Sequence, residues 1–337
     1  MRRSLLVLLL IAALLPQAIA KKWTVDNNPG NSADFATLPL AHDGAADGDT
    51  LYVRGSTVGY DNLVVKKKLY IFGPGYFLTE NPSTQSFPVP ATLGTITFSN
   101  NSTVTSASGS LLTGFVLARV SITTFAGSVT IKRNYITGDG GNIPITIDRS
   151  SNNVITQNHI EESPTSNSTA TILNFGIATN NIISNNFILT PNIAISSTSA
   201  ASLIVRNNVI KGDVTIFNSE FKNNTLTTGT YTATSSVTTN NIGDATQFGT
   251  ADGNQQNVTM TSVFDGTGST DGQWKLATGS PAIGAGVGGI DVGMYGGTDP
   301  YVLSGIPHIP NIYQFDGPTT GSTTAGLPIT MKVKSNN

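Results

Sequence analysis

Four side chains in the middle of the chain carry the groups that acid–base chemistry needs: Asp148, Arg149, His159 and Glu161. A carboxylate or an imidazole can take or give a proton near neutral pH, and an arginine can hold an anionic group. The four are near one another in the sequence, but their spacing does not establish that they converge. They are the candidates for catalysis, and the simpler alternative for His159 is an exposed residue at a turn.

Composition argues against metal, cofactor and nucleic-acid chemistry. The chain has no cysteine, and its three histidines, His42, His159 and His308, do not have the spacing of metal ligands. Acidic residues are scattered, whereas Ca²⁺ needs roughly six to eight oxygen ligands, usually with several carboxylates. A net charge of −2 gives no basic footprint for nucleic acid. We therefore expect no metal, no cofactor and no nucleic-acid partner.

A pattern of the form apolar-x-x-Asn-x-apolar recurs through the middle of the chain. Its central residues are Asn134, Asn158, Asn186, Asn208 and Asn224, with Gly114 in the asparagine position of an earlier copy and Asn241 in a degraded last copy. Successive copies are 16 to 28 residues apart, so the pattern is constant while its spacing varies. A solenoid with one fixed corner and loops of variable length has this property.

The chemistry of asparagine suits such a corner. Asparagine and glycine tolerate the left-handed backbone region, and an asparagine amide can bond to the local backbone. Amides at one corner of successive coils can also stack into a hydrogen-bonded ladder. We expect the flanking apolar residues to point into the core and the chain to bend sharply at each corner.

A second strand follows each corner. Ile145 and Ile147 alternate with polar residues, as do Leu173 and Phe175, which predicts strands with one buried face. Charged residues are only 11% of the chain, against about 25% in an ordinary domain. Short strands, low charge and a corner of fixed chemistry predict an all-β fold, a parallel β-helix rather than a sandwich.

Ligand-binding features can be placed on this repeat. Arg133, Arg149 and Arg206 could form a basic stripe for an acidic glycan, but Arg133 and Arg206 differ by one position relative to their asparagines. Tyr135 and Phe187 share the position after the asparagine and could stack on sugar rings, although Phe187 could equally belong to the core.

The N-terminal part carries a family resemblance. Phe35-Ala-Thr-Leu38, Gly48-Asp-Thr-Leu-Tyr-Val53 and Leu69-Tyr-Ile-Phe-Gly73, followed by asparagine-cornered coils, resemble the pectate-lyase-like right-handed parallel β-helices, and in particular secreted bacterial β-helix-repeat proteins. Residues 279–293 resemble the closing coil of such proteins. The resemblance implies the fold over residues 23–297. It does not imply a reaction, because function depends on a site and not on a fold.

The chain then divides into four parts. Residues 1–20 read as a signal peptide, with Arg2 and Arg3, an apolar run and a small-residue cleavage site, and no later segment is apolar enough to span a membrane. Residues 21–53 form an N-terminal cap with the first strands, and residues 54–297 form the β-helix. Residues 298–337 form a proline-containing tail with two short strands. A β-hairpin covering the C-terminal end of the solenoid is the favoured arrangement, and a small appendage for assembly or a sorting tail are the alternatives.

These features favour a secreted protein, extracellular, at the cell surface or periplasmic, with a non-enzymatic surface, adhesive or glycan-binding role. The alternative is a polysaccharide lyase or glycoside hydrolase acting on an extracellular glycan. The lack of a cluster of charged side chains favours the first. A polysaccharide is the expected partner in both, and we expect it along the exposed parallel sheet.

Overall fold

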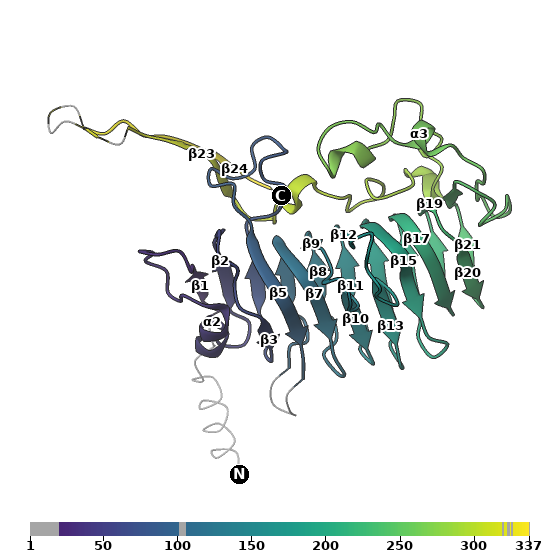
Figure 1. The fold of residues 1–337 in the computed structure, drawn as a ribbon, viewed down its shortest axis with the longest axis horizontal. Helices are drawn as coiled ribbons and strands as arrows, with labels where there is room; N and C mark the ends of the chain where they lie inside the picture. Colours follow the sequence, from purple (N-terminus) through teal and green to yellow (C-terminus); the bar gives the residue numbers. More distant parts are fainter. Residues whose placement is uncertain (1–19, 101–105, 319, 322–323, 325, 337) are drawn as a thin grey trace, which may run out of the picture.

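The computed structural model describes residues 20–100, 106–318, 320–321, 324 and 326–336. The predicted fold is confirmed: the chain is a right-handed parallel β-helix whose coils stack along the long axis of the molecule (Figure 1). Except for Ala20, the predicted signal peptide lies outside the described residues. Within those residues, no helix has both the length and the apolar character needed to cross a membrane.

Two parallel sheets make up the coils. Sheet A has ten strands, in the order β1 (Lys22–Val25), β2 (Thr50–Val53), β4 (Tyr70–Phe72), β6 (Leu111–Thr113), β8 (Thr130–Lys132), β11 (Val154–Thr156), β14 (Asn181–Ser184), β16 (Leu203–Arg206), β18 (Glu220–Lys222) and β21 (Val237–Thr239).

Sheet B has twelve strands and follows sheet A in each coil. They are β3 (Leu63–Val65), β5 (Ala91–Phe98), β7 (Phe115–Ile122), β9 (Tyr135–Ile136), β10 (Ile145–Asp148), β12 (His159–Glu161), β13 (Ile172–Phe175), β15 (Phe187–Ser197), β17 (Val209–Phe217), β19 (Thr225–Thr228), β20 (Tyr231–Thr234) and β22 (Ile242–Gly243). In three coils the sheet B strand is interrupted. There β9, β12 and β19 lie beside the start of a longer neighbouring strand, and β10, β13 and β20 lie beside its end.

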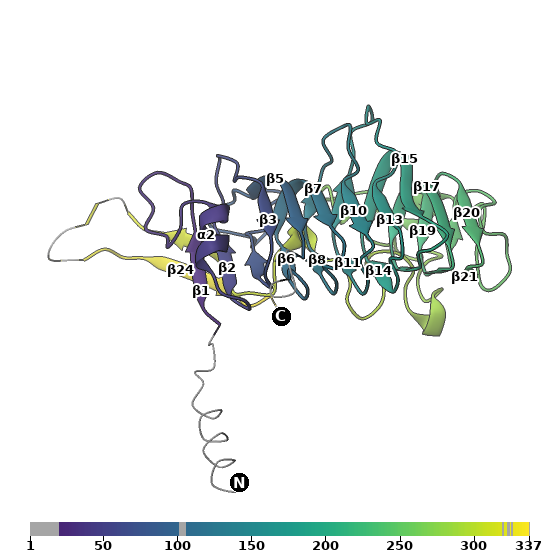
Figure 2. The same cartoon turned by 90° about the horizontal axis from the view of Figure 1, so that it is seen from below.

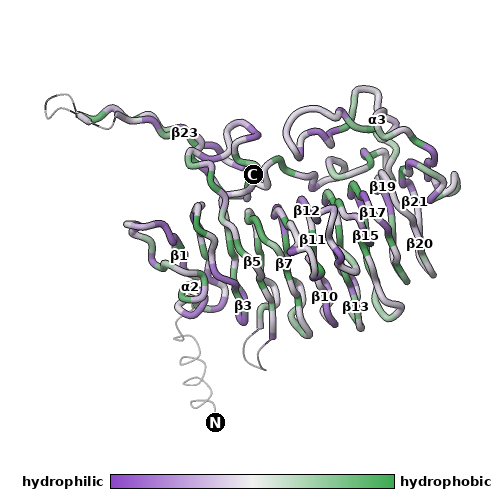
Figure 3. Tube along the Cα trace, in the orientation of Figure 1, coloured by the Kyte–Doolittle hydropathy of each residue, from purple (hydrophilic) through white to green (hydrophobic). Residues whose placement is uncertain are grey.

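The core lies between the sheets, because alternate residues of each strand point inward. Hydrophobic and hydrophilic residues accordingly alternate along many strands in Figure 3. Ile145 and Ile147 are buried as predicted. The prediction for β13 was out by one residue: Ile172 and Asn174 point inward, and Leu173 and Phe175 are only partly buried. A shift of one residue exchanges the two faces of a strand.

The corner asparagines form a continuous ladder inside the solenoid. The side-chain oxygen of each accepts a hydrogen bond from the backbone N–H of the asparagine in the preceding coil, at 2.9 to 3.0 Å from Asn134 through Asn241. Asn254 adds a last member, accepting from the N–H of Asn241 at 2.9 Å. The ladder amides are buried, so the bonds satisfy groups that water cannot reach.

The left-handed residue of each corner is the one before the asparagine, and not the asparagine itself as the sequence suggested. Arg133, Gln157, Asn185, Asn207, Asn223 and Asn240 have φ between 54° and 57°. Gly114, with φ of 84°, also takes this left-handed position. Phe115 stands in the asparagine position of that coil, because its N–H donates to the Asn134 side chain at 3.1 Å.

A second, shorter ladder lies at the turn from sheet B back to sheet A. Asn153 donates from its backbone N–H to the Asn181 side chain at 2.8 Å, and Asn181 donates to the Asn174 side chain at 2.9 Å. All three asparagines are buried. The signal for this ladder in the sequence is weak, because the pattern around Asn153, Ser151-Asn-Asn-Val-Ile-Thr156, recurs only once, as Thr179-Asn-Asn-Ile-Ile-Ser184 around Asn181, and Asn174 lies outside it.

The coils end near Gln255, which bridges to Ile242. Residues 256–310, here called the return segment, run back along the solenoid toward its N-terminal end, where Figure 1 shows them along the upper edge of the coils. They contain α3 (Met260–Val263) and the 3-10 turns η1 (Gly272–Trp274), η2 (Val287–Gly289) and η3 (Leu303–Gly305). Residues 279–293 therefore do not form the closing coil that the sequence suggested.

The return segment is held by the left-handed corner residues, whose side chains point outward. They bond to successive points of the segment in reverse order: Asn240 to Ala285 O (2.9 Å), Asn223 to Val287 N (2.9 Å), Asn207 to Asp291 O (3.1 Å), Asn185 to Gly296 O (2.7 Å), Gln157 to Pro300 O (2.6 Å) and Arg133 to Ile306 O (2.7 Å). Each corner thus bonds inward through its asparagine and outward through the preceding residue.

Beneath the return segment lies a second apolar cluster, outside the solenoid core. Phe187 and Val209, on the outer face of sheet B, pack there against Phe264, Val292 and Met294. This cluster covers the first half of the sheet B strands. The outer face of sheet A is not part of it.

The two ends of the solenoid differ. Helix α2 (Leu38–Gly44) belongs to the predicted N-terminal cap, and the side chain of Thr37 caps its first turn. The predicted C-terminal hairpin is present, formed by antiparallel β23 (Asn311–Asp316) and β24 (Thr330–Lys334). It does not cover the C-terminal end of the solenoid: the return segment carries it to the opposite end, where it projects past the first coils (Figures 1 and 2).

Loss of an inner-ladder amide should destabilise the whole solenoid. The Asn186 side chain accepts from Asn158 N and Nδ2 and donates to Ile155 O and Asn208 Oδ1, all within 3.0 Å. We expect Asn186→Ala to lower the free energy of unfolding in urea by about 3 kcal/mol or more, because buried partners lose their bonds. Asn180→Gly, at an exposed left-handed turn, is the control, expected within about 0.5 kcal/mol of the native protein. Equal effects for the two would contradict the ladder's role.

Loss of an outer-corner side chain should loosen only the return segment. Asn185→Gly keeps the left-handed backbone but removes the bonds to Met294 O and Gly296 O. We expect faster amide exchange across residues 291–300, measured by mass spectrometry, with unchanged exchange in β14 and β16. Faster exchange throughout those strands would show instead that the corner supports the coils themselves.

Candidate functional site

Asp148 and Arg149 lie at the far end of β10, at the turn from sheet B back to sheet A. Arg149 donates to both carboxylate oxygens of Asp148, at 2.9 and 3.0 Å. The Arg149 side chain is largely exposed, and Thr124 also bonds to Asp148. The structure therefore pairs these two candidates with each other.

His159 and Glu161 lie on β12, under the return segment. His159 is 1% exposed, so it is not the exposed turn residue that the sequence favoured. Its ring lies between Tyr135, at 5.2 Å, and Phe187, at 4.6 Å between centroids, and its Nε2 is 3.2 Å from Glu161. The hydrogen bond from His159 lowers the pKa of the Glu161 carboxyl. Such burial keeps the imidazole away from a polymer on the surface.

The two pairs do not meet. Traced to the uninterrupted strand β7, the register places Glu161 beside Ala118 and Asp148 beside Thr123. At about 3.3 Å per residue, these five positions separate the two pairs by roughly 17 Å along the strands. A single site that contains all four residues is therefore not formed.

The three arginines considered as a stripe point in different directions. Arg133 turns toward the return segment, where it bonds to Ile306 O and approaches His308, and burial lowers its pKa to about 10. Arg149 lies at the opposite turn, and Arg206 lies on the outer face of sheet A.

A different basic row does form on that face. Lys132, Arg206 and Lys222 occupy one register row, with Thr156 and Ser184 between them. Lys132 pairs with Asp299 at 2.9 Å and Lys222 with Glu220 at 2.6 Å, while Arg206 is exposed and has no ion-pair partner among the residues that the structure describes. Within that part of the chain, Arg206 is therefore the uncompensated positive charge of the row.

Toward the N-terminal end, the same register row becomes aromatic. Thr24, Tyr52 and Phe72 are aligned on β1, β2 and β4, with their side chains on the outer face of sheet A. The rings of Tyr52 and Phe72 lie 5.6 Å apart at 32° and are both partly exposed. Two tilted, partly exposed rings of this kind offer an apolar surface to a ligand ring.

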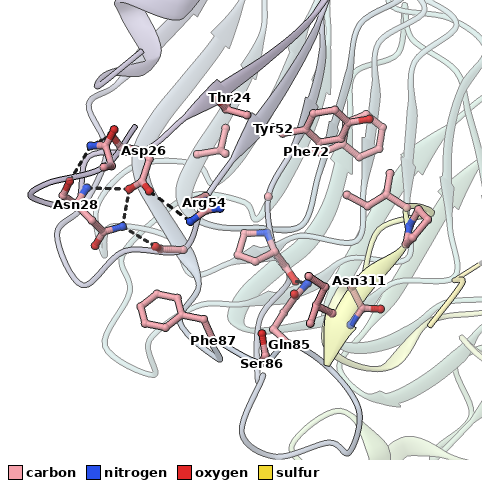
Figure 4. A pocket seen from close by; sticks show the side chains of 18 of the residues that line it. Thr24, Asp26, Asn28, Tyr52, Arg54, Phe72, Gln85, Ser86, Phe87 and Asn311 are labelled. Carbon is pink, nitrogen blue, oxygen red and sulfur yellow. Dashed lines mark hydrogen bonds and ion pairs between the residues drawn. The ribbon is translucent and has the colours of Figure 1, made fainter. Parts of the chain in front are cut away.

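These rings belong to a groove of about 680 Å³, within the usual size of ligand sites. Figure 4 shows Tyr52 and Phe72 on one side and Asp26, Asn28, Arg54, Gln85 and Phe87 around them. Its remaining wall comes from residues 309–312, where the return segment passes into the hairpin. The groove therefore combines an aromatic surface with polar groups from four separate segments.

Local hydrogen bonds fix the groove walls. The Asp26 carboxylate accepts from the backbone N–H and the side chain of Asn28, at 2.8 and 2.6 Å, and Asn28 also donates to Gly55 O at 3.0 Å. At Gly55, a Cβ would lie 1.9 Å from the carbonyl oxygen of Val89, so only glycine lets the 85–90 loop approach this closely. The exposed Arg54 guanidinium lies 4.0 Å from Asp26.

A second groove of about 410 Å³ lies farther along sheet A. Thr156, Ser184, Arg206 and Lys222 line its floor, and residues 287–299 of the return segment line one side. Thr113 and Lys132 lie between the two grooves in the same row. The outer face of sheet A thus carries a row that is aromatic at one end and basic at the other.

Sequence reasoning missed the aromatic pair, although a signal was present. In Thr50-Leu-Tyr-Val53 and Tyr70-Ile-Phe72 the buried residues are Leu51, Val53 and Ile71, so period-two alternation places Tyr52 and Phe72 outside. The aromatic residues that were considered, Tyr135 and Phe187, lie under the return segment. Across the part of the chain that the structure describes, no three His, Asp or Glu residues gather in a way that could hold a metal ion.

Comparisons with known proteins extend the description of the fold only. No family model matches the chain, and no curated protein matches it. Among solved structures, pectate lyase Pel9A is similar, with 11% sequence identity and a TM-score of 0.38, over 83% of this chain and 97% of that one. At this identity the likeness concerns the fold and carries no statement about a reaction.

Proposed function

We propose that this protein is a secreted, non-enzymatic glycan-binding protein that holds an extended polysaccharide along the outer face of sheet A. The observation that carries the proposal is the Tyr52–Phe72 pair, which lies partly exposed in the N-terminal groove. Sugar rings have apolar faces and polar rims, which suit an aromatic surface bordered by amide, hydroxyl and charged groups.

The length of the face supports a polymer rather than a single sugar. One register row runs from Thr24 through Phe72 and Lys132 to Lys222, and the two grooves lie along it. Coils repeat about every 4.8 Å, so the nine strands from β1 to β18 span roughly 40 Å. The unpaired Arg206 favours a polysaccharide with acidic groups.

The candidate residues for catalysis do not support the enzymatic alternative. Asp148 is paired with Arg149, and His159 is buried with Glu161 as its only ion-pair partner among the described residues. Neither pair lies on the outer face of sheet A. Retention of the polymer therefore has better structural support than cleavage.

Removing the two aromatic rings should abolish most of the binding. We expect Tyr52→Ala combined with Phe72→Ala to weaken binding to polygalacturonate, alginate or xylan by about tenfold or more, whichever of these the native protein binds, measured by affinity electrophoresis and calorimetry. Phe125→Ala, which removes an exposed ring from a turn outside the groove, should leave binding unchanged. Equal loss in both variants, or no binding by the native protein, would overturn the proposal.

The same incubations, with and without Ca²⁺, distinguish binding from cleavage. Ultraviolet absorbance of unsaturated uronate and the number of reducing ends should both stay constant. New product would replace the binding role with the lyase or hydrolase alternative.

The charge at Arg206 should matter only for acidic polymers. We expect Arg206→Gln to weaken binding to polygalacturonate or alginate by a few-fold and to reduce its dependence on salt, since an exposed charge acts through screened attraction. Binding to neutral xylan should not change, and Lys211→Gln, on sheet B, serves as the matched control. A similar loss for neutral and acidic polymers would contradict an electrostatic role for Arg206.

A further inference from the structure

The hairpin formed by β23 and β24 has one apolar face and one polar face. The register pairs Ile312 with Val333 and Phe315 with Met331 on one side, and Gln314 with Lys332 and Asp316 with Thr330 on the other. An irregularity at Tyr313 preserves this separation, because it lets both Ile312 and Phe315 face the same way. Leu327 and Ile329 continue the apolar sequence just before β24.

The apolar face is exposed along its whole length. The exposed fractions are 39% for Ile312, 57% for Phe315, 49% for Leu327, 54% for Ile329, 56% for Met331 and 53% for Val333. Other exposed apolar residues of the described chain are mostly scattered singly, as is normal for a surface. A contiguous set on a two-stranded hairpin is different, because an isolated hairpin is marginally stable in water.

The other residues that the structure describes do not cover the face. The base of the hairpin is anchored, since Ser86 donates to Ile312 O at 2.8 Å and Asn336 bonds to Asn311 and Ile309. Beyond the base the two strands project past the first coils in both views (Figures 1 and 2). A partner can therefore reach the apolar face without meeting the solenoid.

We propose that the occupant is the same face of a second copy of this chain, so that two hairpins pack face to face about a twofold axis. The face carries no charged side chain, so like can pack on like without repulsion, and the charged Lys332, Lys334 and Asp316 remain on the outside. A self-complementary patch on one subunit gives a closed dimer rather than a chain of copies.

The area agrees with such a dimer. Covering the exposed half of six apolar side chains on each copy removes roughly 1,000 Å² from water in total, at the lower limit for a specific interface. An interface of this size predicts a dimer that dissociates on dilution. The proposal is independent of glycan binding, because it rests on residues outside the two grooves except for Ile312 at the border.

Sedimentation and light scattering of the full chain, from about 1 to 200 μM, test the proposal. We expect a monomer–dimer equilibrium, with Phe315→Glu raising the dissociation constant at least tenfold. Gln314→Glu adds the same charge to the opposite face and should change it less than twofold. A monomer at every concentration, equal effects of both substitutions, or growth into higher oligomers would overturn the twofold hairpin interface.

A second measurement places the contact on the apolar face. The chain has no cysteine, so Met331→Cys and Lys332→Cys each introduce a single thiol on opposite faces of β24. A short bismaleimide should cross-link the Met331→Cys variant into dimers several-fold faster than the Lys332→Cys variant. Equal rates would show that the copies do not meet through this face.

Discussion

The rest of the structure depends on a two-residue corner between sheets A and B. The first residue is left-handed and points its side chain outward, and the second is an asparagine whose amide is buried and bonds to the next coil. The left-handed conformation costs roughly 1 kcal/mol for a residue other than glycine. The benefit is that one backbone geometry directs two neighbouring side chains to opposite sides of the chain, and at most corners both are amides.

Gly114 shows what happens where the outward amide is absent. It occupies the left-handed position, and a Cβ there would lie 2.7 Å from Pro307 of the return segment. The end of the segment therefore packs directly against the backbone of that coil. At the asparagine corners, the outward side chain lies between the coil and the return segment and hydrogen-bonds to the segment. At the glycine corner there is no side chain, so the segment contacts the backbone of the coil directly.

The position of the return segment determines which aromatic residues can meet a ligand. Tyr135, His159 and Phe187 form a row on sheet B, but the segment covers them with Trp274, whose ring lies 4.5 Å from that of Phe187. Tyr52 and Phe72 form the corresponding row on sheet A, where both rings stay partly exposed in the N-terminal groove. Two rows of similar composition therefore have different roles, one in packing and one at the surface.

Much of the solenoid could be predicted from the sequence because its corner has a distinctive chemistry that repeats. The path of the return segment could not be predicted, because the corner side chains bond mostly to its backbone, as Asn185 does to Met294 O and Gly296 O. Every residue type has these backbone atoms, so such contacts require no particular sequence. The return segment also buries His159, so the burial of His159 could not be predicted either.

The inward face of β13 was ambiguous in the sequence. Ile172 and Leu173 are adjacent and both apolar, so an alternating pattern can start from either residue.

The return segment also explains why so many features meet at the N-terminal end. By running the length of the solenoid it brings residues 309–312 beside loops 26–31 and 85–87, which completes the wall of the aromatic groove. The same residues begin the hairpin, so Asn311 and Ile312 contribute to both. Because the hairpin base and the groove wall are one stretch of chain, pairing of two hairpins would hold two grooves at a fixed separation. Linked sites of this kind bind a long polymer more tightly than either site alone, without any further contact.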